Sequence, residues 1–109
     1  MSDPAWMIYG AYGYSGTLVA EEAVRRGHQP LLAGRSAAPL EALAERLRLE
    51  HRVFDLASGE RIAEEIRDFD LVLHAAGPFV RTWEPMLGAC LRAGVHYVDI
   101  SAEATVLES

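Results

Sequence analysis

The sequence predicts an α/β domain of the Rossmann type, a doubly wound parallel sheet of five strands in the order 3-2-1-4-5. Short apolar runs alternate with longer amphipathic runs, and a glycine-rich segment follows the first apolar run. The longest apolar runs suit strands that helices cover on both faces. With 109 residues, 50% of them hydrophobic, the chain has the size of one domain, and we expect residues 1–109 to form it.

Strands and helices are expected to alternate along the whole chain. The expected strands are WMIYG, PLLAG, RVFD, LVLHAAG and HYVDIS, at residues 6–10, 30–34, 52–55, 71–77 and 96–101. The expected helices lie between them, at residues 17–26, 40–49, 59–67 and 85–93. Parallel neighbours require such crossover connections, so the pattern predicts a parallel sheet.

Residues that start or stop helices agree with these ranges. Gly27 follows the first expected helix and Gly94 ends the fourth, as glycine does at helix carboxyl ends. Ser58 is placed to cap the third helix. Pro39 and Pro85 suit first-turn positions, where a missing backbone N–H group is tolerated.

The charge balance argues against a nucleic-acid partner. The net charge is −6, whereas phosphate backbones are bound by clustered positive charge.

No apolar run approaches the ~18 residues of a membrane span, and no signal peptide precedes the first strand, so we expect a cytoplasmic protein. The four histidines and the lone Cys90 show no metal-ligand spacing, and no metal is expected.

The segment IYGAYGYSG places Gly10, Gly13 and Gly16 between the first strand and the first helix. Unpaired N–H groups and the positive end of the helix dipole make such a turn a phosphate site. Gly10 would form the tight turn, Gly13 would admit a pyrophosphate, and Gly16 would let the helix pack closely. The commonest fingerprint has glycine where Tyr12 stands here, and this wider spacing is a variant familiar among NADP-preferring families. The alternative is a turn that needs positive φ and holds no ligand.

The second strand ends in Gly34, Arg35 and Ser36, where NAD-binding domains usually carry Asp or Glu. No carboxylate is present to repel a 2′-phosphate, and Arg35 offers it a fork of donors with the Ser36 hydroxyl alongside. These residues favour NADP(H) as the cofactor. The alternative is that Arg35 is a solvated loop residue.

Further cofactor contacts are expected from the same edge of the sheet. Asp55 could accept a hydrogen bond from the adenine amine, although capping toward Ala57 and Ser58 is the alternative. The small residues after the fourth strand would lie beside the nicotinamide ribose, or would form only a turn. The remaining candidates in the glycine turn and after the fourth strand are Tyr12, Tyr14, Ser15, Ala75, Ala76, Gly77 and Pro78.

The motifs YGAYGYSG, AGR, AAGPF, EP at Glu84 and Pro85, and HYVDISAE occur here in one order. With them the chain resembles the NADP-binding domain of saccharopine-dehydrogenase-like oxidoreductases, a group that includes trans-acting enoyl reductases, over residues 7–103. The resemblance implies that residues 10–16 and Arg35 hold the cofactor and that AAGPF lies along its nicotinamide half. Ala102 stands where family members tend to have glycine. Such proteins also continue into a second, substrate-binding domain, which this chain lacks.

We therefore expect the cofactor half of an NADP(H)-dependent oxidoreductase that acts on an unknown small molecule and is inactive as this chain alone. All ten basic residues are arginine, so a catalytic tyrosine–lysine pair cannot exist here, and no catalytic residue is identified. His74, Asp99 and Glu103 lie at the ligand side, although capping is the alternative for Asp99. The second hypothesis is a non-catalytic NADP(H)-sensing or protein-interaction module. Apolar surface near the fifth strand would favour a homodimer.

Overall fold

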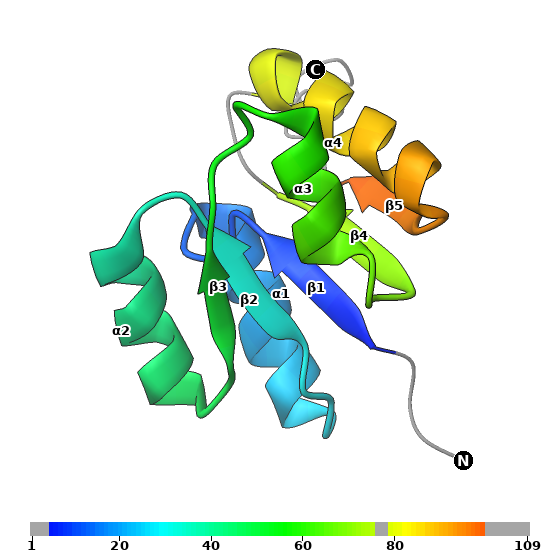
Figure 1. Ribbon diagram of the computed structural model, residues 1–109. Helices are drawn as coiled ribbons and strands as arrows, with labels where there is room; N and C mark the ends of the chain where they lie inside the picture. Colours follow the sequence, from blue (N-terminus) through cyan, green and yellow to red (C-terminus); the bar gives the residue numbers. More distant parts are fainter. Residues whose placement is uncertain (1–4, 76–78, 100–109) are drawn as a thin grey trace, which may run out of the picture.

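The computed structural model describes residues 5–75 and 79–99, in which strands and helices alternate as the sequence predicts (Figure 1). The strands are β1 Trp6–Tyr9, β2 Leu31–Gly34, β3 His51–Val53, β4 Leu71–His74 and β5 His96–Asp99. The helices are α1 Tyr14–Arg25, α2 Ala37–Leu47, α3 Gly59–Ile66 and α4 Phe79–Ala93.

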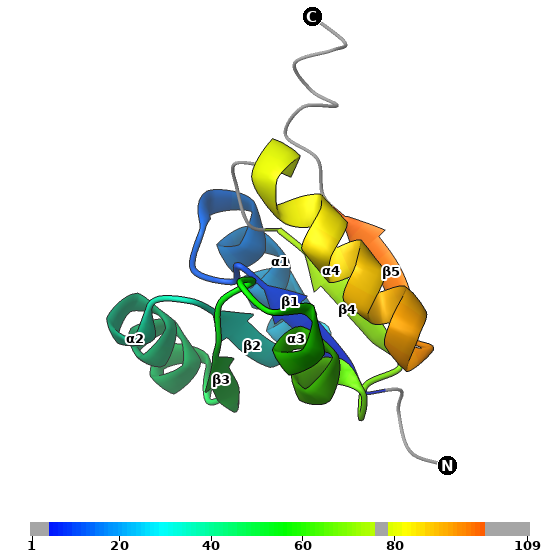
Figure 2. The ribbon, with the colours of Figure 1, turned by 45° about the horizontal axis from the view of Figure 1, so that its top comes forward.

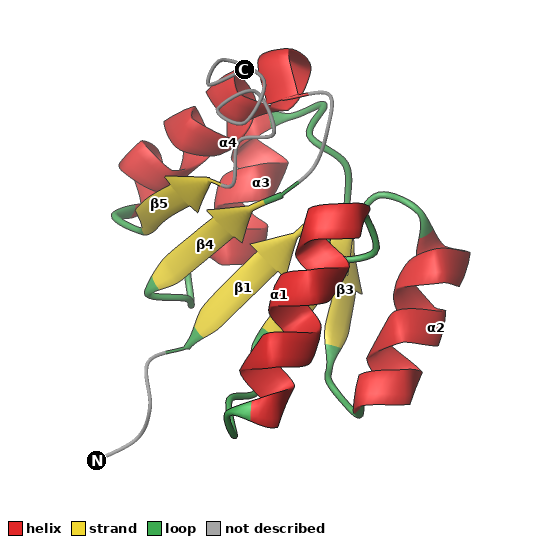
Figure 3. Cartoon of the chain, turned by 180° about the vertical axis from the view of Figure 1, so that it is seen from behind, coloured by secondary structure: helices red, strands yellow, loops and turns green. Residues whose placement is uncertain are grey.

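The five strands form one parallel sheet in the order β3-β2-β1-β4-β5, which confirms the predicted fold class. β1 is central, and its Ile8 aligns with Leu32 of β2 on one side and Leu73 of β4 on the other. All carboxyl ends therefore meet at one edge, which we call the carboxyl edge. Figure 3 shows α1 beginning beside the arrowhead of β1 at this edge.

Helices cover both faces of the sheet, with α1 and α2 on one side and α3 and α4 on the other (Figures 1 and 2). Successive β1 residues alternate between the two layers, as side chains of a strand must. Met7 packs with Ile62 and Met86 in one core cluster, whereas Ile8 packs with Leu40 in the other. Both faces are thus apolar, which explains the continuous hydrophobic runs of the strands.

Several helix ends agree with the sequence. Gly27 and Gly94 have φ of 88° and 73°, a left-handed conformation that glycine adopts without strain. The Ser58 hydroxyl accepts a hydrogen bond from the Arg61 N–H group at 3.3 Å and caps α3. Pro39 lies in the first turn of α2, as expected.

Three helix starts were predicted wrongly. α1 begins at Tyr14 rather than at residue 17, because the extended Gly13 already serves as its N-cap. α2 begins at Ala37 rather than at residue 40, because the extended Ser36 serves as its N-cap. α4 begins at Phe79, so Pro85 lies inside the helix and not in its first turn. Proline removes one intrahelical hydrogen bond but keeps a helical φ, and the burial of Met86 and Cys90 stabilises the helix around it.

Candidate functional site

The glycine turn, residues 10–16, is anchored to the neighbouring strand before α1 begins. Gly10 has φ of 82°, which turns the chain sharply after β1. The N–H groups of Gly10 and Ala11 both donate to the Ala33 carbonyl oxygen of β2, at 2.8 and 3.2 Å. The Thr17 hydroxyl closes the turn from the other side by donating to the Ala11 carbonyl oxygen at 2.9 Å. The backbone of the turn is therefore held in place by the chain itself.

The three glycines of the turn differ in what requires them. A Cβ atom at Gly16 would meet the Gly10 carbonyl oxygen and would lie 2.8 Å from the Ala11 Cα atom, so close packing of the turn demands glycine there. At Gly13 the corresponding atom would lie 3.4 Å from the Gly10 oxygen, an ordinary contact, and φ is −74°. Neither packing nor a left-handed φ requires glycine at Gly13, so besides the N-cap preference for glycine over alanine, a ligand approaching the backbone would account for it.

The start of α1 carries positive potential that its own side chains do not neutralise. The first helical hydrogen bond runs from the Thr17 N–H group to the Gly13 carbonyl oxygen at 2.9 Å, so the N–H groups of residues 14–16 precede the hydrogen-bond ladder. Gly13 offers no side-chain cap, and the first turn contains no acidic residue. An anion at this position would be stabilised by the helix dipole and by these donors.

The end of β2 brings Tyr12 and Arg35 next to the glycine turn. The Tyr12 ring lies directly against Gly34, the last residue of β2. Arg35 is exposed, and no hydrogen bond or ion pair joins it to another of the residues whose side chains are described, 5–75 and 85–98. Ser36 is the N-cap of α2, but its side chain makes no capping bond.

The Tyr9 hydroxyl links the end of β1 to the segment after β3. It is buried and donates to the Phe54 carbonyl oxygen at 2.7 Å. Burial raises the Tyr9 pKa most, the charges of Tyr12 and Asp55 raise it further, and Arg35 lowers it. Tyr12, Arg35 and Asp55 thus all act electrostatically on one hydroxyl group at the carboxyl edge.

The other predicted site residues have varied surroundings. Asp55 is exposed and accepts a hydrogen bond from the Ala57 N–H group at 3.0 Å, the local bond that was its alternative interpretation. Tyr14 is 84% exposed, and Ser15 is half-buried beside it. The Ala75 N–H group donates to the Tyr9 carbonyl oxygen at 2.8 Å. Ala76, Gly77, Pro78 and Glu103 lie outside the described residues, as does the Asp99 side chain.

Sequence reasoning missed several residues that shape this edge. Thr17 was overlooked, although a hydroxyl directly after the third glycine is a usable signal for a bond back to the turn. No role was predicted for the Tyr9 hydroxyl, which ties β1 to the segment after β3. His74 is fully buried, with the Tyr9 and Tyr97 ring centroids 5.9 and 6.0 Å from its own. Its place at the end of β4 matches the prediction, but its surroundings are those of a core residue.

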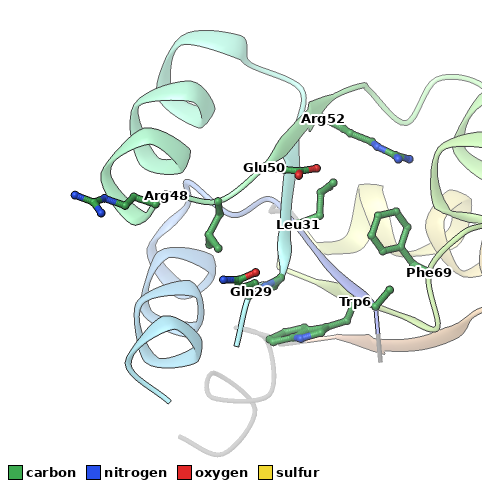
Figure 4. A pocket seen from close by; sticks show the side chains of 10 residues that line it. Trp6, Gln29, Leu31, Arg48, Glu50, Arg52 and Phe69 are labelled. Carbon is green, nitrogen blue, oxygen red and sulfur yellow. The ribbon is translucent and has the colours of Figure 1, made fainter. Parts of the chain in front are cut away.

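A hollow of about 310 Å³ lies at the opposite, amino edge of the sheet (Figure 4). Trp6 and Leu31, the first residues of β1 and β2, line it together with Glu50 and Arg52. Arg52 donates to the Glu65 carbonyl oxygen at 2.6 Å and lies over the Phe69 ring, 5.1 Å from its centroid. This hollow contains none of the predicted site residues.

Neither a metal cluster nor a membrane helix occurs in the part of the chain that the structure describes. Across residues 5–75 and 85–98, whose side chains are described, no three His, Cys, Asp or Glu side chains gather closely enough to hold a metal ion. Over residues 5–75 and 79–99, each helix falls short of the length and apolar character needed to cross a bilayer.

Comparison with known proteins agrees with the geometry. The family described as saccharopine dehydrogenase NADP binding domain matches residues 6–108. This match confirms the predicted family resemblance and the predicted cofactor. A human protein named saccharopine dehydrogenase-like oxidoreductase is 28% identical over an alignment that covers 94% of this chain and 28% of that protein. A trans-acting enoyl reductase of Mycobacterium ulcerans is 30% identical over an alignment that covers 89% of this chain and 25% of that protein. The chain thus spans about a quarter of the length of these relatives.

Solved structures show the same fold. Apo saccharopine dehydrogenase (L-Glu forming) from Saccharomyces cerevisiae superposes with a TM-score of 0.77 and 16% identity, over 96% of this chain and 24% of that one. A structure described as AtPrR2 with NADP+ and (+)pinoresinol gives a TM-score of 0.70 and 16% identity, over 89% of this chain and 36% of that one.

Proposed function

The chain belongs to the saccharopine dehydrogenase NADP binding domain family, and from this premise we propose that it holds NADP(H) for an oxidoreductase. A second domain of the longer protein would bind the substrate, a small molecule. The observation that carries the proposal is Gly13. Neither packing nor φ requires glycine there, and it lies at the start of a helix without acidic residues in its first turn, at the same edge of the sheet as the exposed arginine that follows β2.

The residues at the carboxyl edge fit the parts of a phosphorylated dinucleotide. The pyrophosphate would lie against Gly13 and the N–H groups of residues 14–16, where donors and helix dipole favour it. Arg35 would bind the 2′-phosphate with a planar fork of donors, and Ser36 would add a hydroxyl. We assign the remaining contacts to Tyr12, Tyr14, Ser15, Asp55, Ala75, Ala76, Gly77 and Pro78.

Bound NADP(H) supplies hydride transfer, and the chain supplies position and electrostatics. The anchored turn between β1 and α1 would fix the pyrophosphate, and with it the distance of the nicotinamide from the end of β4. We assign no catalytic residue, and we expect the chain alone to have negligible turnover.

Calorimetric titration of the chain with NADPH and NADH tests the proposal. We expect micromolar-range binding of NADPH and weaker binding of NADH, because Arg35 would contact only the phosphorylated ribose. Absence of NADPH binding would contradict the proposal as a whole. Equal affinity for the two dinucleotides would contradict the role of Arg35.

A non-catalytic NADP(H)-sensing or protein-interaction module is the second candidate. Exposed apolar side chains favour it: Leu91 on α4 is 74% exposed and Val98 on β5 is 44% exposed. The length of the native gene product distinguishes the two candidates, because a reading frame that continues past Ser109 into a substrate domain favours the enzyme. We also propose a cytoplasmic location, to be checked by cell fractionation.

The exposed Val98 at the edge of the sheet also supports self-association as a homodimer. Size-exclusion chromatography at several concentrations tests this, because a dimer would elute earlier as the concentration rises. Elution as a monomer throughout would contradict it.

A further inference from the structure

Gly34 ends β2 with an ordinary strand conformation, so its backbone does not require glycine. Positive φ values occur elsewhere, among them those of Gly10, Gly27 and Gly94. What excludes a side chain at this position is Tyr12. A Cβ atom on Gly34 would lie 2.5 Å from the Tyr12 Cε2 atom and 3.2 Å from its Cδ2 atom.

The Tyr12 ring has little freedom to move aside. It is half-buried and packs against the core cluster between the sheet and the helices α1 and α2. The backbone just before it is held, because the Ala11 N–H group donates to Ala33 and the Ala11 carbonyl oxygen accepts from Thr17. A side chain at position 34 would therefore have to displace a packed ring on an anchored turn.

Position 34 is where the fold usually distinguishes the two dinucleotides. A carboxylate at the end of the second strand accepts hydrogen bonds from the ribose hydroxyls of NAD(H), and its charge repels a 2′-phosphate. Here that position is covered by an aromatic ring, and the next residue is the exposed cation Arg35. A carboxylate side chain is thus sterically excluded at position 34, and a positive charge is present at the adjacent position 35.

We propose that Tyr12 determines cofactor specificity: its ring on Gly34 excludes a carboxylate at the end of β2 and so reserves the ribose end of the site for a 2′-phosphate bound by Arg35. This inference rests on the proposed function. If Tyr12 has this role, an acidic residue at position 34 selects NADH only when Tyr12 is made small as well. A role for Arg35 alone would not require the change at Tyr12.

A thermal double-mutant cycle tests the contact without any ligand. Gly34→Ala should lower the melting temperature by about 4–8 °C, because the added methyl group meets the ring. In a Tyr12→Ala background the same change should leave the melting temperature of that background unaltered. Tyr12→Phe is the matched control, because it keeps the ring and should keep the full effect of Gly34→Ala. Additive changes in the cycle would overturn the inference.

Titration with NADPH and NADH then tests specificity. Gly34→Asp alone should weaken NADPH binding at least about tenfold through charge repulsion and should gain no NADH affinity. Tyr12→Ala combined with Gly34→Asp should bind NADH at least about tenfold more tightly than the wild-type chain does and should prefer it over NADPH. A gain of NADH affinity in Gly34→Asp alone, or none in the double variant, would overturn the inference.

The two proposals fail in different ways. If the wild-type chain binds no dinucleotide, the proposed function fails and this inference falls with it. If the wild-type chain prefers NADPH but the double variant gains no NADH affinity, the proposed function stands and only the role of Tyr12 is wrong. The melting temperatures of the double-mutant cycle show whether a variant that fails to bind a dinucleotide is still folded.

Discussion

Arg52 and Arg35 lie in two regions of the molecule that use the same side chain differently. Arg52, beside the hollow at the amino edge, donates to the Glu65 carbonyl oxygen, lies 3.7 Å from the Glu65 carboxylate and covers the Phe69 ring. Arg35, at the carboxyl edge, is exposed and has no such partner among residues 5–75 and 85–98. One guanidinium is used by the fold, and the other leaves its charge and its five donors available to an anion.

The glycine turn shows the same division within a single loop. Gly16 is required by the backbone that it touches, whereas the chain makes no comparable demand on Gly13. A site built for a ligand contains groups that the fold does not need, next to groups that hold the site in shape. Variants of each kind should therefore separate stability from binding.

Gly16→Ala should have the largest effect, because it places a methyl group against the backbone of Gly10 and Ala11. The N–H groups of those two residues donate hydrogen bonds to the Ala33 carbonyl oxygen, so their backbone resists displacement. We expect the free energy of unfolding, measured with urea, to fall by about 3 kcal/mol. Gly88→Ala on α4 is the matched control, since its Cβ would meet nothing within 4 Å, and it should stabilise the chain by about 0.5–1 kcal/mol. Equal stability of the Gly16 variant and the wild type would mean that the turn is less tightly packed than the geometry indicates.

Arg35→Ala should weaken NADPH binding about 10- to 100-fold, or roughly 1.4–2.7 kcal/mol, and leave the melting temperature unchanged. NADH binding should hardly change, because that dinucleotide lacks the 2′-phosphate. Arg25→Ala is the control: it removes the same charge at the far end of α1, where Arg25 is paired with Glu22. A similar loss of NADPH affinity in both variants would show that net charge, and not a contact at Arg35, governs binding.

Gly13→Ala should sharpen the contrast with Gly16. Its extended backbone accepts alanine, so we expect stability to change by less than about 1 kcal/mol. A methyl group at the N-cap would hold the pyrophosphate away, so both NADPH and NADH should bind about tenfold more weakly in calorimetric titrations. Unchanged binding would remove the main observation behind the proposed function.

The fold could be predicted from the sequence because its signals are local. The five apolar runs, the helices between them and the caps at Gly27, Ser58 and Gly94 each depend on a few neighbouring residues. The start of α4 could not, because Pro85 carries a strong local signal for a helix start, and nothing in the neighbouring residues distinguishes a first-turn proline from one inside a helix.

The candidate site was predictable only in part. Residues that follow parallel strands must lie at one edge, which is why Tyr12, Arg35 and Asp55 all influence the Tyr9 hydroxyl electrostatically. Tyr12 and Gly34 belong to different segments of the chain, and no hydrophobic pattern in the sequence predicts that they are in contact. Likewise, the sequence alone does not distinguish Gly16 from Gly13. Only the three-dimensional turn shows that backbone atoms block a Cβ at Gly16, whereas a ligand would account for the absence of a Cβ at Gly13.

Arg52→Ala should have the smallest of these effects and tests the other side of the comparison. The variant loses a hydrogen bond to the Glu65 carbonyl oxygen and a cation–π contact with Phe69, but Arg52 is half-buried and its ion pair is partly screened by solvent. We expect the free energy of unfolding to fall by about 1 kcal/mol, with NADPH affinity unchanged. Arg52→Lys should fall between the wild type and the alanine variant, because an ammonium group keeps the charge without the planar fork. A loss of NADPH affinity in Arg52→Ala would mean that the two edges of the sheet are coupled, and the division between an arginine for the fold and an arginine for the ligand would fail.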